Sequence, residues 1–387
     1  MKRLLINYVY YCPVGHLIEA IKHARGYYEA DKALQVSLLV NSETPIELAN
    51  ACDWIEAVYP ISANEVLILG EEAESVRAVP KDWDYVLTDP RVKHLTPGFD
   101  EEWLTTVQLV LQKVFVGKEI NGITPHRSGK EDEDVSTQTP LPYKLNAHIE
   151  IPLPQSAKVF VKKYANSGPI ITILPAGSSG SRQSPSLKMW EEICRVLSET
   201  IPNIRIKFTG VTQGEHGRTA TGDVTSENIN DLVWELPNAE NCFDIGLWNQ
   251  LALIEASKMF CSPHSGFAFL SQVVGTPWLA ISGCPWPEYF FNDTPFYSVL
   301  PDCPSYPSKG EIKTGCGKLL SEGKTSICMR DENIRKKLPE ITTAAQLLLE
   351  SQFSYHDAVE LHLKKLKDSK RDMKKFFFFD GIRGIRQ

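Results

Sequence analysis

Apolar residues recur along the first third of the chain with two spacings that alternate. Contiguous apolar runs, typical of buried strands, are followed by segments in which apolar residues recur every three or four positions, as on one helix face. Leu17, Ile18, Ile21 and Ala24 carry the helical spacing in the first such segment. The pattern predicts strands at 3–10, 34–41, 55–61 and 83–89, and helices at 16–30, 45–53 and 100–115. Strands this apolar, alternating with helices, indicate a parallel sheet covered on both faces.

The alternation fades between residues 117 and 168 and then resumes. Charged and turn-forming residues in this interval predict a mobile surface loop at about 117–142. Proline, cysteine and aromatic residues are frequent at 286–328, so this segment is expected to be irregular. The pattern elsewhere predicts strands at 170–177, 204–210, 259–262 and 278–283, and helices at 186–201, 246–258, 343–352 and 354–368.

The two alternations predict an α/β chain with two Rossmann-like, doubly wound domains that face each other across a cleft. We expect the first domain at 1–160 and the second at 161–345. The helices within 346–387 are expected to pack back on the first domain. Ligands bind such sheets at the carboxyl ends of their strands, so the strand-end turns are where chemistry is expected.

Composition narrows the function classes. The chain has 387 residues, a formal net charge of −7 and 42% hydrophobic residues, which is ordinary for two globular domains and argues against nucleic-acid binding. No apolar run approaches the ~18 residues of a membrane span, and the first residues read as a strand rather than a signal peptide. The basic stretch at 364–375 is expected to be a solvated helix face, with peripheral membrane contact as the minor alternative. Nine scattered cysteines favour a reducing cytoplasm.

The turn after the first predicted strand contains Pro13, Gly15 and His16. His16 falls at a helix N-terminus, which is expected to lower its pKa and keep it neutral and able to accept a proton. A general base and a structural capping histidine are equally open. Gly15, with Asp89 at the end of a later strand, is assigned to an acceptor side of the cleft.

The turn after the strand at 170–177 is rich in glycine and serine. Its backbone N–H groups and hydroxyls could hold a phosphate, and two basic side chains could add positive charge. The candidates are Gly177, Ser178, Ser179, Arg182 and Lys188. The order of residues is not that of a P-loop, and turn chemistry alone gives the same composition.

Two further turns complete the set. Glu215 follows the strand at 204–210, where a carboxylate commonly binds ribose hydroxyls, although a solvated loop glutamate is at least as likely. His264, Ser265 and Gly266 follow the strand at 259–262 and precede an apolar segment read as a helix. The N-terminus of that helix would favour a diphosphate.

Metal-binding motifs are absent from the sequence in their usual spacings. Cys303, Cys316 and Cys328, together with Cys284, could bind iron or zinc, but their spacings are loose. Buried or partly exposed thiols are the favoured interpretation, and no metal or other cofactor is expected.

The order of these motifs resembles glycosyltransferase family 9, the heptosyltransferase-like enzymes. The resemblance is carried by the first turn and helix with the strand "LQVSLLVN", by "ITILPAGSSG" with its following helix, by "LALIEASKMFCSPHSGFAFLSQVVGTPWLAISG", and by "SICMRDENI". The family has a catalytic Asp where this chain has His16, and Asp-Thr-Gly where it has His264, Ser265 and Gly266. Both histidines are similar to those in the turns of family 1 glycosyltransferases.

The resemblance implies a GT-B fold and inverting transfer of a hexose or heptose from a nucleotide-diphosphate sugar to an acceptor hydroxyl. The first domain would bind a glycan, protein or small-molecule acceptor, and the second domain would bind the donor. His16 would be the general base, and the turns with Ser178, Arg182 and Ser265 would stabilise the leaving diphosphate without a metal. Two alternatives stay open: a nucleotide-sugar epimerase or hydrolase of the same fold, and a non-catalytic nucleotide-sugar-binding subunit.

Overall fold

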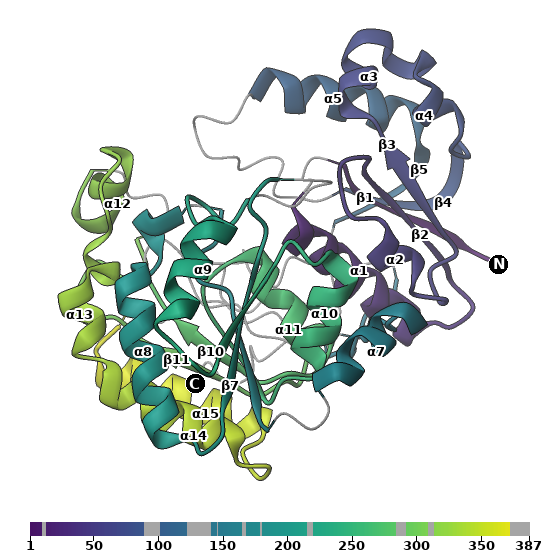
Figure 1. Cartoon of the computed structure of the whole chain (residues 1–387). Helices are drawn as coiled ribbons and strands as arrows, with labels where there is room; N and C mark the ends of the chain where they lie inside the picture. Colours follow the sequence, from purple (N-terminus) through teal and green to yellow (C-terminus); the bar gives the residue numbers. More distant parts are fainter. Residues whose placement is uncertain are drawn as a thin grey trace. The chain divides into compact units, whose positions relative to one another are not determined.

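The computed structural model contains two compact units, each built around one parallel sheet (Figure 1). Described residues up to Pro152 form the first unit, and those from Leu153 onward form the second. The structure describes residues 1–9, 13–88, 101–121, 141–144, 146–164, 168–178, 180–214, 220–283, 292–308 and 313–371.

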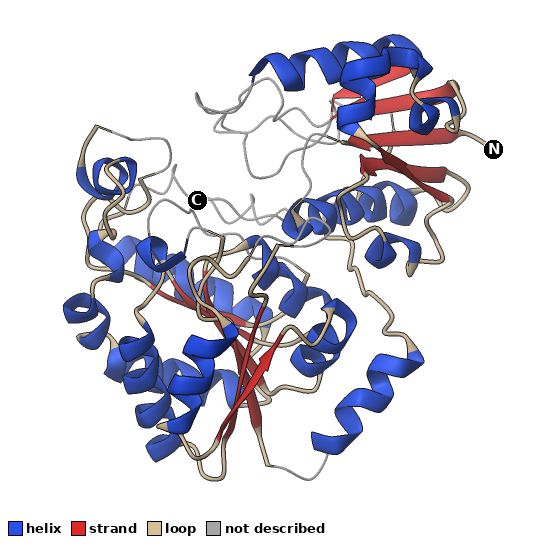
Figure 2. Ribbon diagram, turned by 45° about the horizontal axis from the view of Figure 1, so that its top comes forward, coloured by secondary structure: helices blue, strands red, loops and turns tan. Residues whose placement is uncertain are grey.

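The sheet of the first unit has the strand order β3-β2-β1-β4-β5, and every pair is parallel. Its strands are β1 (Arg3–Tyr8), β2 (Gln35–Asn41), β3 (Ala57–Ile61), β4 (Asp82–Thr88) and β5 (Val116–Asn121). Its helices are α1 (Val14–Ala30), α2 (Glu47–Asn50), α3 (Ala63–Leu69), η1 (Gly70–Glu72), α4 (Glu74–Arg77) and α5 (Glu101–Val114). Helices lie on both sides of this sheet (Figure 2). The parallel sheet predicted from the alternation is therefore confirmed.

Two apolar contacts hold this sheet between its helices. On one face, Leu5 and Leu39 pack in a cluster that includes Val66 of α3 and Leu111 of α5. Helix α1 packs against β1 and β2, and the four apolar residues that predicted it are at most 1% exposed. Each fully buried side chain of this size contributes roughly 1.5–3 kcal/mol, so burial rather than helix propensity fixes α1.

The sheet of the second unit has the order β11-β10-β9-β6-β7-β8, again parallel throughout. Its strands are β6 (Ile170–Ile173), β7 (Arg205–Gly210), β8 (Ala239–Phe243), β9 (Met259–Pro263), β10 (Trp278–Ile281) and β11 (Phe296–Val299). The helices up to β10 are α7 (Gln155–Val161), η3 (Lys162–Tyr164), η4 (Gly180–Gln183), α8 (Leu187–Thr200), α9 (Ser226–Trp234), α10 (Leu247–Glu255), η5 (Gly266–Ala268) and α11 (Phe269–Val273). Those after β11 are α12 (Gly315–Ser321), η6 (Ile327–Met329), α13 (Asp331–Arg335), α14 (Leu338–Leu349) and α15 (Tyr355–Asp368).

Helix α8 shows how local sequence positions an element of this unit. Ser186 caps its N-terminus by accepting a hydrogen bond from the Met189 amide at 3.1 Å. Trp190, Ile193 and Leu197 follow at helical spacing and are fully buried. The Trp190 indole also donates to the Pro175 carbonyl at 2.8 Å, which ties α8 to the turn after β6.

The boundary between the units differs from the one expected at residue 160. Helix α7 packs against α10 of the second unit, and Phe160 and Val161 contribute to a small cluster there with Leu253. Apolar contacts, rather than the change in composition, therefore decide where the second unit begins.

Helices α14 and α15 pack against β11 of the second unit, whereas the sequence analysis expected the C-terminal helices to pack back on the first. Leu366 of α15 joins the core of the second unit, and Tyr355 and His362 lie against the Phe296 ring of β11 at 5.8 and 5.7 Å between centroids. The edge strand β11 supplies the apolar partner that α15 needs. Residues 372–387 lie outside the described residues.

Two further expectations need correction. Residues 116–121 form β5, so the loop expected at 117–142 begins no earlier than residue 122, and residues 122–140 lie outside the described part of the chain. The segment expected to be irregular at 286–328 contains β11 and α12. No helix among the described residues is long and apolar enough to cross a membrane.

Candidate functional site

His16 lies in the first turn of α1, directly after the turn that leaves β1. Pro13 precedes the helix in an extended conformation, and its carbonyl accepts the first helical hydrogen bond from the His16 amide at 3.0 Å. Gly15 is buried beside it. The placement of His16 at a helix N-terminus, predicted from the sequence, is confirmed.

Glu19 holds the His16 ring from one helical turn away. His16 Nδ1 lies 3.1 Å from Glu19 Oε2, and the glutamate side chain is 7% exposed whereas the histidine side chain is 32% exposed. A carboxylate at this position accepts from Nδ1–H and so directs the basic lone pair to Nε2. The pair has the geometry of a proton acceptor with an orienting acid.

The predicted phosphate-binding residues in and after the turn that follows β6 differ in exposure. Ser178, Arg182 and Lys188 are exposed, and Gly177 is partly buried. The amide and hydroxyl of Ser181 donate to the Asp223 carboxylate at 2.7 and 2.6 Å. Burial alone would raise the pKa of Asp223, but these two hydrogen bonds hold it below its usual range.

Close packing of two glycines shapes the same loop. Gly180 and Gly222 both have positive φ, and a Cβ on Gly222 would lie 2.1 Å from the Gly180 Cα. Only glycine allows this approach. The Asp223 turn therefore clamps the β6 turn, and the Ser181 amide is already used in this contact.

The turn after β9 lies directly against the turn after β6, because β6 and β9 are neighbours in the sheet. A Cβ on Gly177 would lie 3.0 Å from Ser265 Cβ and 3.7 Å from the His264 carbonyl oxygen. Ser265 Oγ is fully buried and has no hydrogen-bond partner among the described residues. The structure thus brings Gly177, His264 and Ser265 together at the carboxyl ends of the neighbouring strands β6 and β9.

His264 is buried against β10, and its role in donor binding stays a prediction. It is 7% exposed, and its ring centroid lies 5.1 Å from that of Trp278. The segment expected to form one helix after it is the short turn η5 followed by α11, of three and five residues. The helical segment that begins at Gly266 is therefore short in this described stretch. Its dipole adds little to the effect of its own first N–H groups.

Ser179, Glu215 and Asp89 lie outside the described residues. Among the candidates that are described, Lys188 stands apart from the contact between the turns. It lies on α8 near Glu192, whose carboxylate is bound by Arg335 at 2.5 Å. The sequence reading missed Glu19 and Asp223. The His-x-x-Glu spacing on one helix could have indicated the first, whereas nothing local indicates the second.

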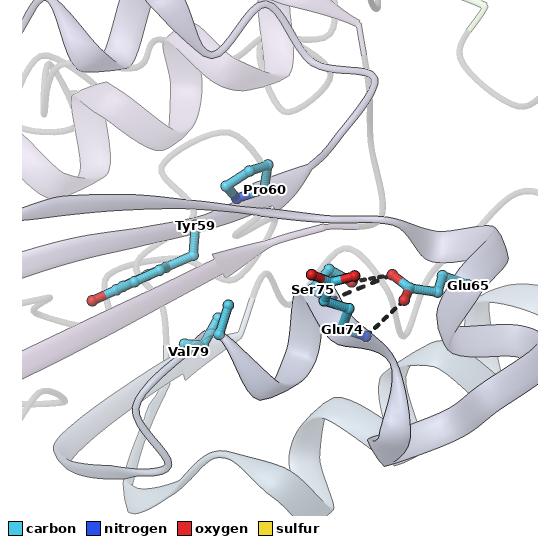
Figure 3. Close-up of a pocket in the computed structure, with 7 residues that line it drawn as sticks. Tyr59, Pro60, Glu65, Glu74, Ser75 and Val79 are labelled. Carbon is cyan, nitrogen blue, oxygen red and sulfur yellow. Dashed lines mark hydrogen bonds between the residues drawn. The ribbon is translucent and has the colours of Figure 1, made fainter.

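A cavity of about 540 Å³ in the first unit is lined by none of these residues (Figure 3). Tyr59, Glu65 and Ser75 are among its lining residues. The Glu65 carboxylate accepts from Ser75 Oγ at 2.8 Å and from the Glu74 amide at 2.6 Å, and these hydrogen bonds lower its pKa. The charge of Glu65 is already satisfied by the loop that it fastens, so this carboxylate is not free to react in the cavity.

Comparison with solved structures identifies the fold. The glycosyl transferase family 9 structure from Veillonella parvula DSM 2008 matches with a TM-score of 0.59 and 13% identity, covering 90% of this chain and 97% of that one. The chain has the GT-B fold. Escherichia coli ADP-heptose lipopolysaccharide heptosyltransferase II matches with a TM-score of 0.52 and 12% identity, over 89% and 100% of the two chains. Escherichia coli heptosyltransferase WaaC with ADP-2-deoxy-2-fluoro heptose matches with 0.51 and 12%, over 88% and 99%.

The GT-B fold predicted from the family 9 resemblance is therefore confirmed. No family model matches the chain, and no curated protein matches it in sequence.

Proposed function

We propose that this chain is an inverting glycosyltransferase that moves a sugar from a nucleotide-diphosphate donor to an acceptor hydroxyl. The observation that carries the proposal is the His16–Glu19 pair at the end of a central strand of a GT-B fold. Heptosyltransferase structures with the same fold, one of them containing an ADP-sugar analogue, support a nucleotide-diphosphate sugar as the donor class.

His16 Nε2 would take the proton from the acceptor hydroxyl as the oxygen attacks the anomeric carbon. The bond from that carbon to the diphosphate breaks on the opposite face, so the configuration at the carbon inverts. Glu19 would remain ionised and stabilise the imidazolium that forms. General-base catalysis of this kind is worth roughly 10²–10⁴ in rate.

The diphosphate leaving group gains charge as the bond breaks. In this proposal Ser265 Oγ, which is buried beside Gly177, would donate a hydrogen bond to that leaving group. Ser178 and Arg182 are exposed at the same turn and would add a hydroxyl and a positive charge. We assign His264 in this proposal to supporting the turn rather than to direct binding of the donor diphosphate.

We propose only the class of the donor, a nucleotide-diphosphate sugar. We likewise propose only the class of the acceptor, which is a glycan, a protein or a small molecule. A cytoplasmic location, expected from the cysteine content, is also part of it.

A panel of nucleotide-diphosphate sugars tests the proposal in two stages. A donor that binds should raise the melting temperature of the full chain, because a ligand of the native state stabilises it by RT ln(1 + [L]/Kd). With that donor and a pool of acceptors, the product should have inverted anomeric configuration. Epimerised or free sugar released without acceptor would instead favour an epimerase or hydrolase. Donor binding without any turnover would favour a binding subunit.

A further inference from the structure

Three cysteines from separate segments converge in the second unit. Cys303 follows β11, Cys316 lies in the first turn of α12, and Cys328 lies in η6. They are 5%, 0% and 2% exposed. The Sγ–Sγ distances are 3.5 Å from Cys303 to Cys316 and 3.5 Å from Cys316 to Cys328, and all three sulfurs lie within 4.8 Å of one another.

These distances suit a shared metal ion better than a disulfide bond. Sulfur ligands about 2.3 Å from a tetrahedral metal lie somewhat under 4 Å apart, whereas bonded sulfurs are about 2 Å apart. None of the three cysteines is in a disulfide. No other group of three potential metal ligands of this compactness occurs among the residues that the structure describes.

Two other buried cysteines of this unit, on regular elements, give a contrast. Cys194 lies on α8 and Cys261 on β9, both within regular elements of the same apolar cluster that includes Cys303, Cys316 and Cys328. Burial raises the pKa of both thiols, which are packed as small apolar side chains. The three-cysteine cluster instead lies where the chain is mainly turns and short helices, so few regular backbone contacts hold it together.

The surroundings of the cluster are shaped to bring the thiols together. Ser305 Oγ lies 3.1 Å from Cys303 Sγ, and a Cβ on Gly315 would lie 2.5 Å from that oxygen. The Arg371 guanidinium donates to the carbonyl of Cys303 at 2.6 Å and to that of Pro301 at 2.7 Å. Three thiolates and one divalent cation carry a net charge of −1, which a neighbouring guanidinium offsets.

The cluster also adjoins the turn after β6. The Ser326 amide, two residues before Cys328, donates to the Arg182 carbonyl at 3.0 Å. On its other side, a Cβ on Gly283 would lie 3.4 Å from Cys328 Cβ and 2.3 Å from Met329 Cε. Whatever holds Cys328 therefore also holds η6 against Arg182 and the end of β10.

We propose that Cys303, Cys316 and Cys328 bind one soft divalent transition-metal ion, Fe²⁺ or Zn²⁺, and that this ion fastens the 303–329 segment beside the β6 turn. The three thiols each lose a proton when the ion binds, and a fourth coordination position is left for a further ligand. The ion is structural, and no step of sugar transfer passes through it.

Metal analysis of the full-length protein tests the site directly. Protein purified without oxygen from medium containing iron and zinc should contain about one equivalent of either metal, and Cys316→Ser and Cys328→Ser should each contain at least about five-fold less. Cys194→Ser, which removes a buried thiol outside the cluster, should keep the wild-type metal content. Iron or zinc in the wild type supports the proposal and names the ion.

A second measurement keeps the test decisive if the serine variants fold poorly. Wild-type protein reconstituted with Co²⁺ should show sulfur-to-cobalt charge-transfer absorption that increases to about one equivalent. Less than about a fifth of an equivalent of any transition metal, as purified and after reconstitution, would overturn the proposal, as would wild-type content in Cys316→Ser. Neither measurement depends on donor or acceptor, so failure of the proposed transferase activity would not affect the result.

Discussion

Each unit places a histidine just beyond the carboxyl end of a central parallel strand, yet the two side chains have different surroundings. His16, after β1, is 32% exposed and lies 3.1 Å from a nearly buried carboxylate. His264, after β9, is 7% exposed and packs against the Trp278 ring. The same residue type at the same kind of strand end is therefore suited to proton transfer in one unit and to packing in the other.

The difference arises from the segment that comes after each histidine. After β1, the chain forms the 17-residue helix α1, and the helical spacing places Glu19 within reach of His16. After β9, the chain makes the turn η5 before a short helix, and the ring is enclosed beside β10. Exposure and an acidic partner, rather than the presence of a histidine, identify the candidate base.

Of the substitutions that test this contrast between the two histidines, replacement of His16 should change turnover the most. His16→Ala should lower turnover by roughly 10²–10⁴ at saturating donor, because the alanine side chain cannot accept a proton. The dissociation constant for the donor should change no more than a few fold, as measured by calorimetry. His356→Ala is the matched control, because His356 is an exposed histidine on α15 that pairs with Glu360.

The second-largest effect is expected for Gly177→Ala, which should weaken donor binding rather than slow proton transfer. The added Cβ would lie 3.0 Å from Ser265 Cβ, so the β9 turn must shift. Overpacking of this kind costs about 1–3 kcal/mol, which corresponds to roughly 5- to 150-fold weaker donor binding if the turns bind the diphosphate. Gly323→Ala, which changes a glycine with positive φ and open space around it, should leave the donor affinity unchanged.

Glu19→Gln should also reduce turnover, because the amide keeps the size of the side chain but cannot stabilise the imidazolium by charge. Donor affinity should stay the same. Wild-type turnover in this variant would show that Glu19 does not act on His16.

His264→Phe should have a small effect on activity. An aromatic ring of similar volume can keep the contact with Trp278, so the free energy of unfolding should change by less than about 1.5 kcal/mol. Turnover per folded molecule should stay within a few fold of wild type. A loss of ten-fold or more in donor affinity would restore His264 as a donor ligand and remove the contrast between the two histidines.

The smallest predicted effect concerns Asp223 and acid stability. Its pKa in the folded chain lies below the usual value, so the unfolded chain binds more protons in the interval between the two. The stabilisation is fully present above the pKa of Asp223 in the unfolded chain, which is about 4. It is lost as the pH falls through the lower pKa of Asp223 in the folded chain. Asp223→Asn should flatten this acid dependence of the melting temperature, and an unaltered dependence would contradict the role of the Ser181–Asp223 contact.

Local patterns predicted the elements of this chain better than the contacts between its turns. The apolar spacing predicted β1, α1, α8 and α15 because burial fixes these segments. It gave no sign of β11, a four-residue edge strand in a proline-rich segment, nor therefore of where α15 packs.

The candidate site was predictable only in part. The position of His16 and the contact between the turns of Gly177 and Ser265 follow from strand order in a parallel fold. The Ser181–Asp223 contact joins residues 42 positions apart and depends on two glycines approaching each other, which no local pattern records. The sequence also contained no indication that His264 is buried, because a histidine in a polar turn has the same sequence pattern whether it faces solvent or Trp278.

The central claim is that His16 transfers the proton and His264 does not. Single-turnover sugar transfer by His16→Ala and His264→Phe, each saturated with the same donor and corrected for folded fraction, tests it most directly. The account predicts a His16→Ala rate at least about 100-fold below that of His264→Phe. Equal rates for the two variants, or a His16→Ala rate above about a tenth of wild type, would contradict it.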